Sequence, residues 1–78
     1  MTLKIDRTVD AAYVTISELP VDHTVRLDAQ RLVDYAEDGT VVGIEFLSVS
    51  RGVNLQGLPA HIELAHLFDD RELRRAAG

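Results

Sequence analysis

The chain has 78 residues, no cysteine and a formal net charge of −5 at pH 7, so we expect one small domain over residues 1–78 with a thin core. Without cysteine it forms neither disulfides nor thiolate metal sites, and a reducing cytoplasm is the expected compartment. The acidic balance disfavours nucleic acid as a partner, and no apolar run approaches the roughly 20 residues that span a membrane.

Alternation of apolar and polar residues predicts β-strands through the first part of the chain. Leu3 and Ile5 point to one side of their strand, while Lys4 and Asp6 point to the other. The same period of two marks further strands in AAYVTIS at 11–17, HTVRL at 23–27 and RLVDYA at 31–36. We therefore expect about five antiparallel strands over residues 3–47.

The acidic corner at residues 37–40 predicts a tight hairpin. If Asp38 and Gly39 are the two central residues of a type I′ turn, Val33 lies opposite Ile44. Continuing that register gives a contiguous apolar face: Val33, Tyr35, Val42, Ile44 and Phe46. The other face mixes Asp34 and Glu45 with leucine and valine, so we expect the C-terminal segment or another subunit to cover part of it.

The C-terminal third has helical spacing. Residues 48–58 have two glycines and form a connector, and Pro59 suits the first turn of a helical segment over 59–76. The spacing places Leu58, Ile62 and Ala65 on one stripe. The apolar residues of a second stripe are Leu64, Leu67 and Phe68. Asp69 and Glu72 resemble a capping box, which leaves open one kinked helix or two. The overall prediction is an α+β fold, a small antiparallel sheet followed by one or two helices.

Three stretches resemble a known family: VDAAYVTIS at 9–17, HTVRLD at 23–28 and VDYAEDGTVVGIEFLS at 33–48. Over about residues 3–50 the chain resembles the domain of unknown function 2283 family of small bacterial domains. The resemblance implies a small antiparallel sheet domain with no assigned activity, and it favours a partner-binding role. The chain departs from the family pattern at Ala36, Gln30 and Arg31, which speaks against a shared acidic metal site.

Few residues are candidates for chemistry. Asp10, Tyr13 and Asp34 could line a shallow cleft, with Asp10 as base or ligand anchor and Tyr13 as hydroxyl donor. In the structural alternative Asp10 caps a turn and Tyr13 covers the sheet. The acidic residues near Gly39 lack calcium-loop spacing, and His61 and His66 are five apart where zinc motifs use four. We expect neither a metal nor a cofactor.

Two functions remain open at this point. The first is a homo-oligomeric protein–protein interaction module, most simply a homodimer, in which Leu64, Leu67 and Phe68 face a second chain. A regulatory or antitoxin-like role with a partner encoded nearby belongs to this hypothesis. The alternative is a small-molecule-binding protein or enzyme that uses the site of Asp10, Tyr13 and Asp34.

Overall fold

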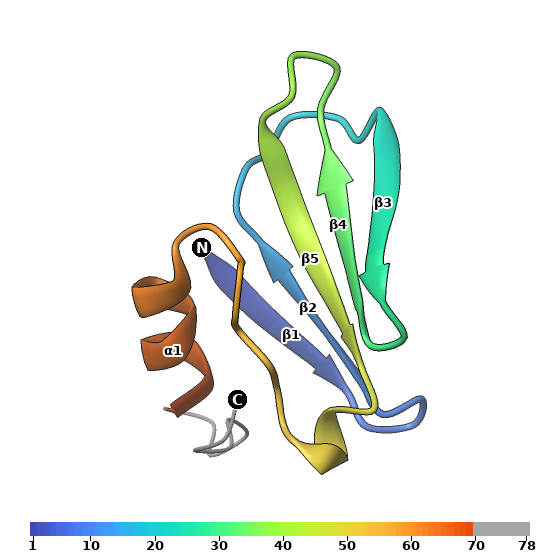
Figure 1. Ribbon diagram of the computed structural model, residues 1–78, viewed down its shortest axis with the longest axis vertical. Coiled ribbons are helices and arrows are strands. Elements are labelled where there is room, and N and C mark those ends of the chain that lie inside the picture. Colours follow the sequence, from blue (N-terminus) through green and yellow to red (C-terminus); the bar gives the residue numbers. More distant parts are fainter. Residues whose placement is uncertain (70–78) are drawn as a thin grey trace. The chain divides into compact units, whose positions relative to one another are not determined.

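The computed structural model of the protein describes residues 1–69, and the chain divides into two compact units, Met1–Ser48 and Val49–Gly78. The described part has a five-stranded antiparallel sheet followed by one α-helix, which confirms the predicted α+β fold (Figure 1). Asp69 of the predicted capping box is described, whereas Glu72 and the predicted second helix lie outside the described residues.

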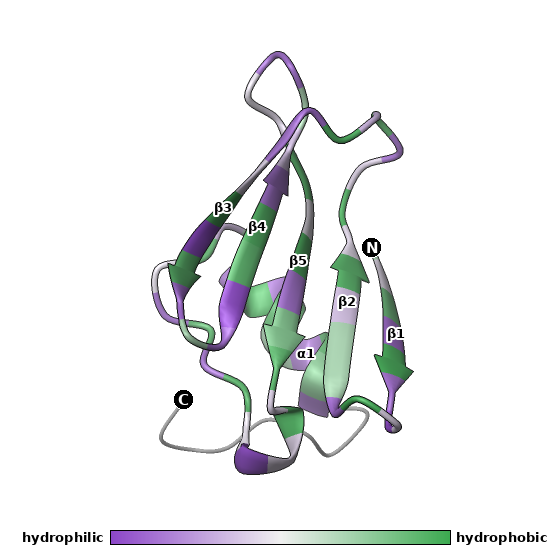
Figure 2. Ribbon diagram, turned by 90° about the vertical axis from the view of Figure 1, so that its right-hand side faces the viewer, coloured by the Kyte–Doolittle hydropathy of each residue, from purple (hydrophilic) through white to green (hydrophobic). Residues whose placement is uncertain are grey.

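The first unit is the sheet. Its strands are β1 (Thr2–Asp6), β2 (Ala11–Thr15), β3 (His23–Asp28), β4 (Arg31–Tyr35) and β5 (Val41–Leu47). They lie in the order β1-β2-β5-β4-β3, so the hairpin β1–β2 joins the meander β3–β4–β5 where β2 pairs with β5 (Figure 2). This order leaves β1 and β3 as the two edges of the sheet.

Apolar residues gather on one face because the strand register aligns them. Val14 lies opposite Ile44 on β5, and Ile44 lies opposite Val33 on β4. Val14 and Ile44 are 0% exposed. Phe46 lies two residues after Ile44 on β5, on the same face of the sheet. It is also buried, and it lies opposite Ala12 on β2. A slip of one residue would move this whole set to the other face, so burial fixes the register.

The β4–β5 turn differs from the predicted type I′ turn. The Gly39 N–H donates to the Ala36 carbonyl at 3.0 Å, and the Ala36 N–H donates to the Thr40 carbonyl at 2.8 Å. The loop therefore contains residues 37–39, and only Gly39 has a positive φ, 89°, as in a hairpin that ends in a glycine bulge. Asp38 is not among the residues with positive φ. The predicted type I′ turn is wrong.

A second irregularity restores the predicted register further down the hairpin. The pairing shifts between Asp34 and Tyr35, so Tyr35 lies opposite Val41 and not opposite Val42 as predicted. Below that point, Val33 lies opposite Ile44 as expected. The extra residue in β5 thus compensates for the longer loop, and the buried face keeps its alignment.

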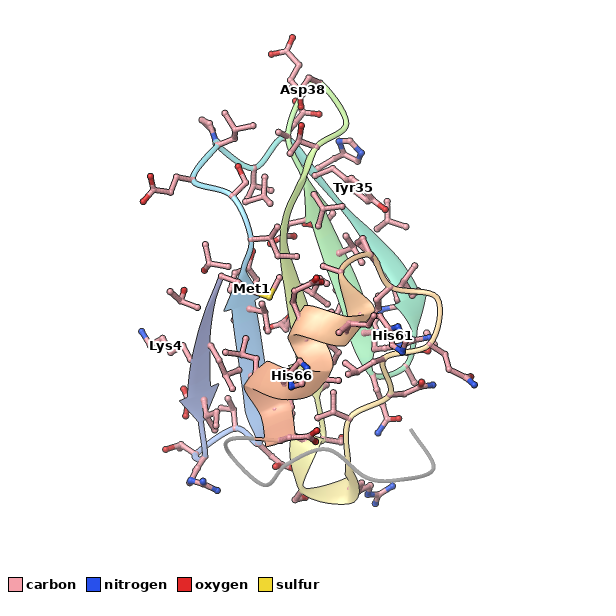
Figure 3. All side chains as sticks on the ribbon, turned by 90° about the vertical axis from the view of Figure 1, so that its left-hand side faces the viewer. Met1, Lys4, Tyr35, Asp38, His61 and His66 are labelled. Carbon is pink, nitrogen blue, oxygen red and sulfur yellow. The ribbon has the colours of Figure 1, made fainter. Side chains whose placement is uncertain are left out.

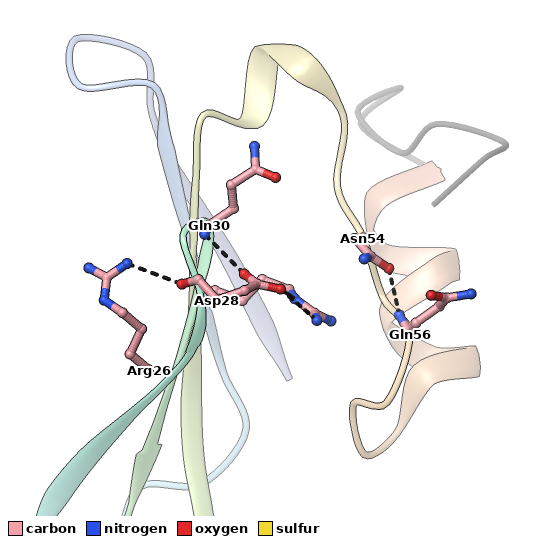
Figure 4. A network of polar contacts seen from close by, with 6 residues as sticks. Arg26, Asp28, Gln30, Asn54 and Gln56 are labelled. Carbon is pink, nitrogen blue, oxygen red and sulfur yellow. Dashed lines mark hydrogen bonds and ion pairs between the residues drawn. The ribbon is translucent and has the colours of Figure 1, made fainter.

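The β3–β4 connection is held by Asp28. Its carboxylate accepts the Gln30 N–H at 3.0 Å and pairs with the Arg31 guanidinium at 2.8 Å (Figure 4). The hydrogen bond from Arg31, followed by that from Gln30, holds the pKa of the Asp28 carboxyl below its usual range. The β3–β4 register shifts between Arg26 and Asp28, so Leu27 is left out of the regular pairing.

The second unit begins with the 3₁₀ helix Val49–Arg51 and continues through a connector to α1 (His61–Asp69). Asn54 accepts the Gln56 N–H through its side-chain oxygen at 2.9 Å within this connector (Figure 4). The helix begins at His61 and not at Pro59 as predicted. Ala60 has a left-handed φ of 54°, which is incompatible with a helical turn. The connector and the helix contribute a further buried set: Val49, Val53, Leu55, Leu58, Leu64 and Phe68.

Within residues 1–69, no helix combines the length and apolarity that crossing a membrane requires.

Candidate functional site

Two of the three predicted site residues meet on one face of the sheet. The Tyr13 hydroxyl, on β2, donates to Asp34 Oδ2, on β4, at 2.7 Å. Because β5 lies between β2 and β4, the phenol ring must cross a whole strand to reach this carboxylate.

Gly43 on β5 makes this crossing possible. It lies opposite Asp34 on one side and Thr15 on the other. A Cβ atom added at Gly43 would lie 2.1 Å from the Tyr13 hydroxyl oxygen and 2.4 Å from the ring carbon that bears it. Real Cβ atoms do not approach other atoms so closely. Glycine is therefore required here, as expected where a side chain passes close over a strand.

Asp34 has a second hydroxyl partner. The Thr24 hydroxyl on β3 donates to Asp34 Oδ1, so both carboxylate oxygens of Asp34 accept a hydrogen bond. We call Tyr13, Asp34 and Thr24 the hydroxyl–carboxylate row. It links β2, β4 and β3, and the Tyr13 side chain crosses β5 to reach Asp34. Thr24 lies directly opposite Asp34, whereas Tyr13 is two residues from Thr15, which is level with Asp34.

The electrostatics of this row favour a structural role. Partial burial raises the pKa of the Tyr13 hydroxyl, and the hydrogen bond to Asp34 and the charges of Asp34 and Glu45 raise it further. The phenol therefore keeps its proton at neutral pH and acts as a donor. A general acid or base needs a pKa near the working pH, so Tyr13 is poorly suited to proton transfer.

Asp10 does not join this row. It lies in the β1–β2 turn with a left-handed φ of 55°, and it immediately precedes β2. Asp34 lies at the level of Thr15, five residues further along β2. At about 3.4 Å per residue, this places the two levels roughly 17 Å apart. The three predicted residues therefore do not form one site.

A shallow hollow lies beside the row, with a volume of about 210 Å³. It is lined by Lys4, Asp6, Val9, Ala11, Ala12, Tyr13 and Glu45. Neither Asp10 nor Asp34 borders it. Ligand pockets usually enclose roughly 300–1,000 Å³ and bury most of the ligand. This hollow is smaller and open to solvent, so its form gives no support to an enzyme active site.

The acidic corner is a turn. Asp38 lies at its tip, and its carboxylate accepts the Thr40 N–H at 2.9 Å, which lowers the pKa of the Asp38 carboxyl (Figure 3). His61 and His66 are both exposed on α1. Residues 1–69 contain no group of three or more histidine, aspartate or glutamate side chains that could hold a metal ion.

The residues predicted to contact a second chain lie on α1. Leu64 and Phe68 are 0% exposed within the single chain, and Leu67 is half-buried. Ile62, on the other stripe, is 65% exposed. A second chain would reach Leu64 and Phe68 only after they were uncovered, and their role at an interface stays a prediction.

The edge strand β3 is the feature that the sequence pattern did not single out. All six of its residues are exposed, including the apolar Val25 at 41% and Leu27 at 42%. Val21, just before the strand, is 50% exposed. The alternation at residues 23–27 predicted a strand, but its place at the sheet edge depends on the strand order, which this alternation does not encode.

A comparison with known families matches residues 3–50 to a family described as protein of unknown function (DUF2283). No curated protein and no solved structure matches the chain.

Proposed function

The chain belongs to the DUF2283 family of proteins of unknown function, and on this premise we propose that it is a protein–protein interaction module that assembles as a homodimer. The proposal places the module in a reducing cytoplasm, in keeping with a chain that has no cysteine. It assigns no metal, cofactor or reaction to the chain.

The observation that carries the proposal is the exposed β3 edge. An edge strand presents unpaired backbone N–H and C=O groups that another strand can pair with. β3 adds exposed valine and leucine side chains to these groups. Strand addition at a sheet edge is a recurrent mode of protein recognition, in which backbone bonds give affinity and side chains give specificity. Closed twofold symmetry is the commonest way in which a soluble chain satisfies such a surface.

The alternative, a small-molecule-binding protein or enzyme, has less support. The hydroxyl–carboxylate row uses its polar groups on one another, Asp10 lies far from it, and the neighbouring hollow is small and open. We therefore do not carry this function further.

Sedimentation equilibrium over a range of micromolar concentrations tests the proposal. We expect the average mass to rise with concentration from 8.6 kDa towards twice that value. A chain that stays at 8.6 kDa throughout, with the circular dichroism of a folded protein, would rule out the homodimer.

A further inference from the structure

We propose that a second copy of the chain adds to β3 in antiparallel orientation, about a twofold axis that passes through Thr24. This inference rests on the proposed homodimer and specifies its surface and register. The resulting assembly is one continuous sheet of two β1-β2-β5-β4-β3 units joined at their β3 strands.

The two edges of the sheet differ in their suitability for strand addition. On β1, Leu3 and Ile5 are half-buried. The charged Lys4 lies between them, and its side chain is exposed on the other face of the sheet. An outward lysine on an edge strand discourages pairing with another strand. β3 is the opposite edge of the sheet (Figure 1). Every residue of β3 is exposed, and the stretch 21–27 contains three exposed apolar side chains. β3 is therefore the edge open to a partner.

The symmetry limits the choice of register. An antiparallel pair of identical edge strands in one sheet is related by a twofold axis perpendicular to the sheet, which keeps each face on its own side. Because side chains alternate between faces, the axis must pass through a residue and not between two residues. The regular part of β3 ends before the shift at Leu27, so the central candidates are Thr24, Val25 and Arg26.

Only the axis at Thr24 brings opposite charges of the two copies together within residues 22–26. Asp22 then lies opposite Arg26 of the second copy, and this ion pair occurs twice. Towards the centre, His23 lies opposite Val25 of the second copy.

The other two registers lack this ion pair. An axis at Val25 brings no opposite charges together within residues 22–26, and an axis at Arg26 places two arginines opposite each other. Like charges directly opposite on neighbouring strands are destabilising. The charge pattern of the edge thus selects a second copy of this chain as the occupant and Thr24 as the centre.

Disulfide trapping tests the register, because the chain has no cysteine of its own. Directly opposite residues on antiparallel strands have Cα atoms about 4.5–5.5 Å apart, which suits a disulfide. We expect Thr24→Cys to form a disulfide-linked dimer under mild oxidation at least about tenfold faster than Val9→Cys. Val9 is a matched control because it is 65% exposed and lies outside β3. Equal rates at both positions, or faster trapping through Val25→Cys, would overturn the proposed register.

A charge exchange tests the same register without cysteine. Asp22→Arg places two arginines opposite each other in the proposed dimer, so we expect the dimer fraction in sedimentation to fall. Adding Arg26→Asp restores opposite charges at both positions, and we expect the dimer fraction to recover. Failure of the second change to rescue the first would overturn the register.

The two experiments separate this inference from the proposed function. A wild-type dimer without trapping at position 24 and without rescue would keep the homodimer and reject the Thr24 axis. A wild-type chain that is monomeric at every concentration would reject both the homodimer and the Thr24 axis. The β3 edge could then bind only a protein of different sequence.

Discussion

Gly43 is the residue on which the polar face of the sheet depends. Its missing side chain gives the Tyr13 ring its path across β5, and the ring brings its hydroxyl to Asp34. A hydrogen bond to a charged acceptor contributes about 1.5–3 kcal/mol when it is well formed, and less where it is partly open to water. One glycine therefore decides whether β2 and β4 are linked by side chains across the strand between them.

We expect Gly43→Ala to lower the free energy of unfolding by about 1–3 kcal/mol, because the new methyl group occupies the space of the Tyr13 ring. In a Tyr13→Ala background that space is free, so the same change should cost much less. Urea denaturation of the four proteins in this double-mutant cycle measures the coupling. Additive effects of the two substitutions would show that the ring does not depend on Gly43.

The sequence identified Tyr13 and Asp34 as candidate site residues, but it predicted neither their contact nor the part of Thr24 in the row. Tyr13 and Asp34 were both predicted as site residues, and the hairpin register correctly placed Asp34 opposite Gly43. The pairing of β2 with β5 was the missing information, because it joins strands distant in the sequence. A signal was nevertheless present: glycine inside a strand marks a close approach by another group. Asp10 was paired with Tyr13 because both lie near the first turn, in the stretch that resembles the family. Asp34 lies level with Thr15, five residues further along the chain than Asp10.

At the scale of elements, the hydrophobic pattern of the β4–β5 hairpin predicted the correct strand register although the predicted type I′ turn was wrong. Hydrophobic alternation specifies which residues face the core, and it correctly aligned Val33 with Ile44. It does not specify where an extra residue is accommodated. Here the longer loop and the register shift near Tyr35 cancel, so the buried face is the same in both arrangements.

The three-residue turn makes a specific prediction about Asp38 and Gly39. Gly39→Val should lower the free energy of unfolding by about 1 kcal/mol or more, because a β-branched residue is strained at a φ of 89°. Apart from Gly39 and its two chain neighbours, no residue has an atom within 4 Å of the position that the Cβ would take, so the cost is conformational and not steric. Asp38→Asn should be nearly neutral, since an amide oxygen can also accept the Thr40 N–H. Thermal unfolding of the two variants measures both effects, and equal losses would contradict the glycine bulge.

At the scale of the whole molecule, the family match and the division of the chain coincide closely. The match covers residues 3–50, and the sheet unit is Met1–Ser48. The matched region therefore covers the five strands apart from Thr2, whereas α1 lies outside it. The β3 edge lies in the matched region, and the predicted interface residues of α1 do not.

Phe68 tests how far the stability of the chain depends on its second unit. A chain of 78 residues should have a free energy of unfolding of about 4–12 kcal/mol. Phe68 is 0% exposed, and truncating a buried phenylalanine costs about 3–5 kcal/mol. We therefore expect Phe68→Ala to remove a large share of the total, as measured by urea denaturation. Ile62→Ala is the matched control on the same helix, and because Ile62 is 65% exposed its effect should stay within about 0.5 kcal/mol. If both variants unfolded at the wild-type urea concentration, the buried side of α1 would contribute no stability, and the helix would be free to present Leu64 and Phe68 to a second chain.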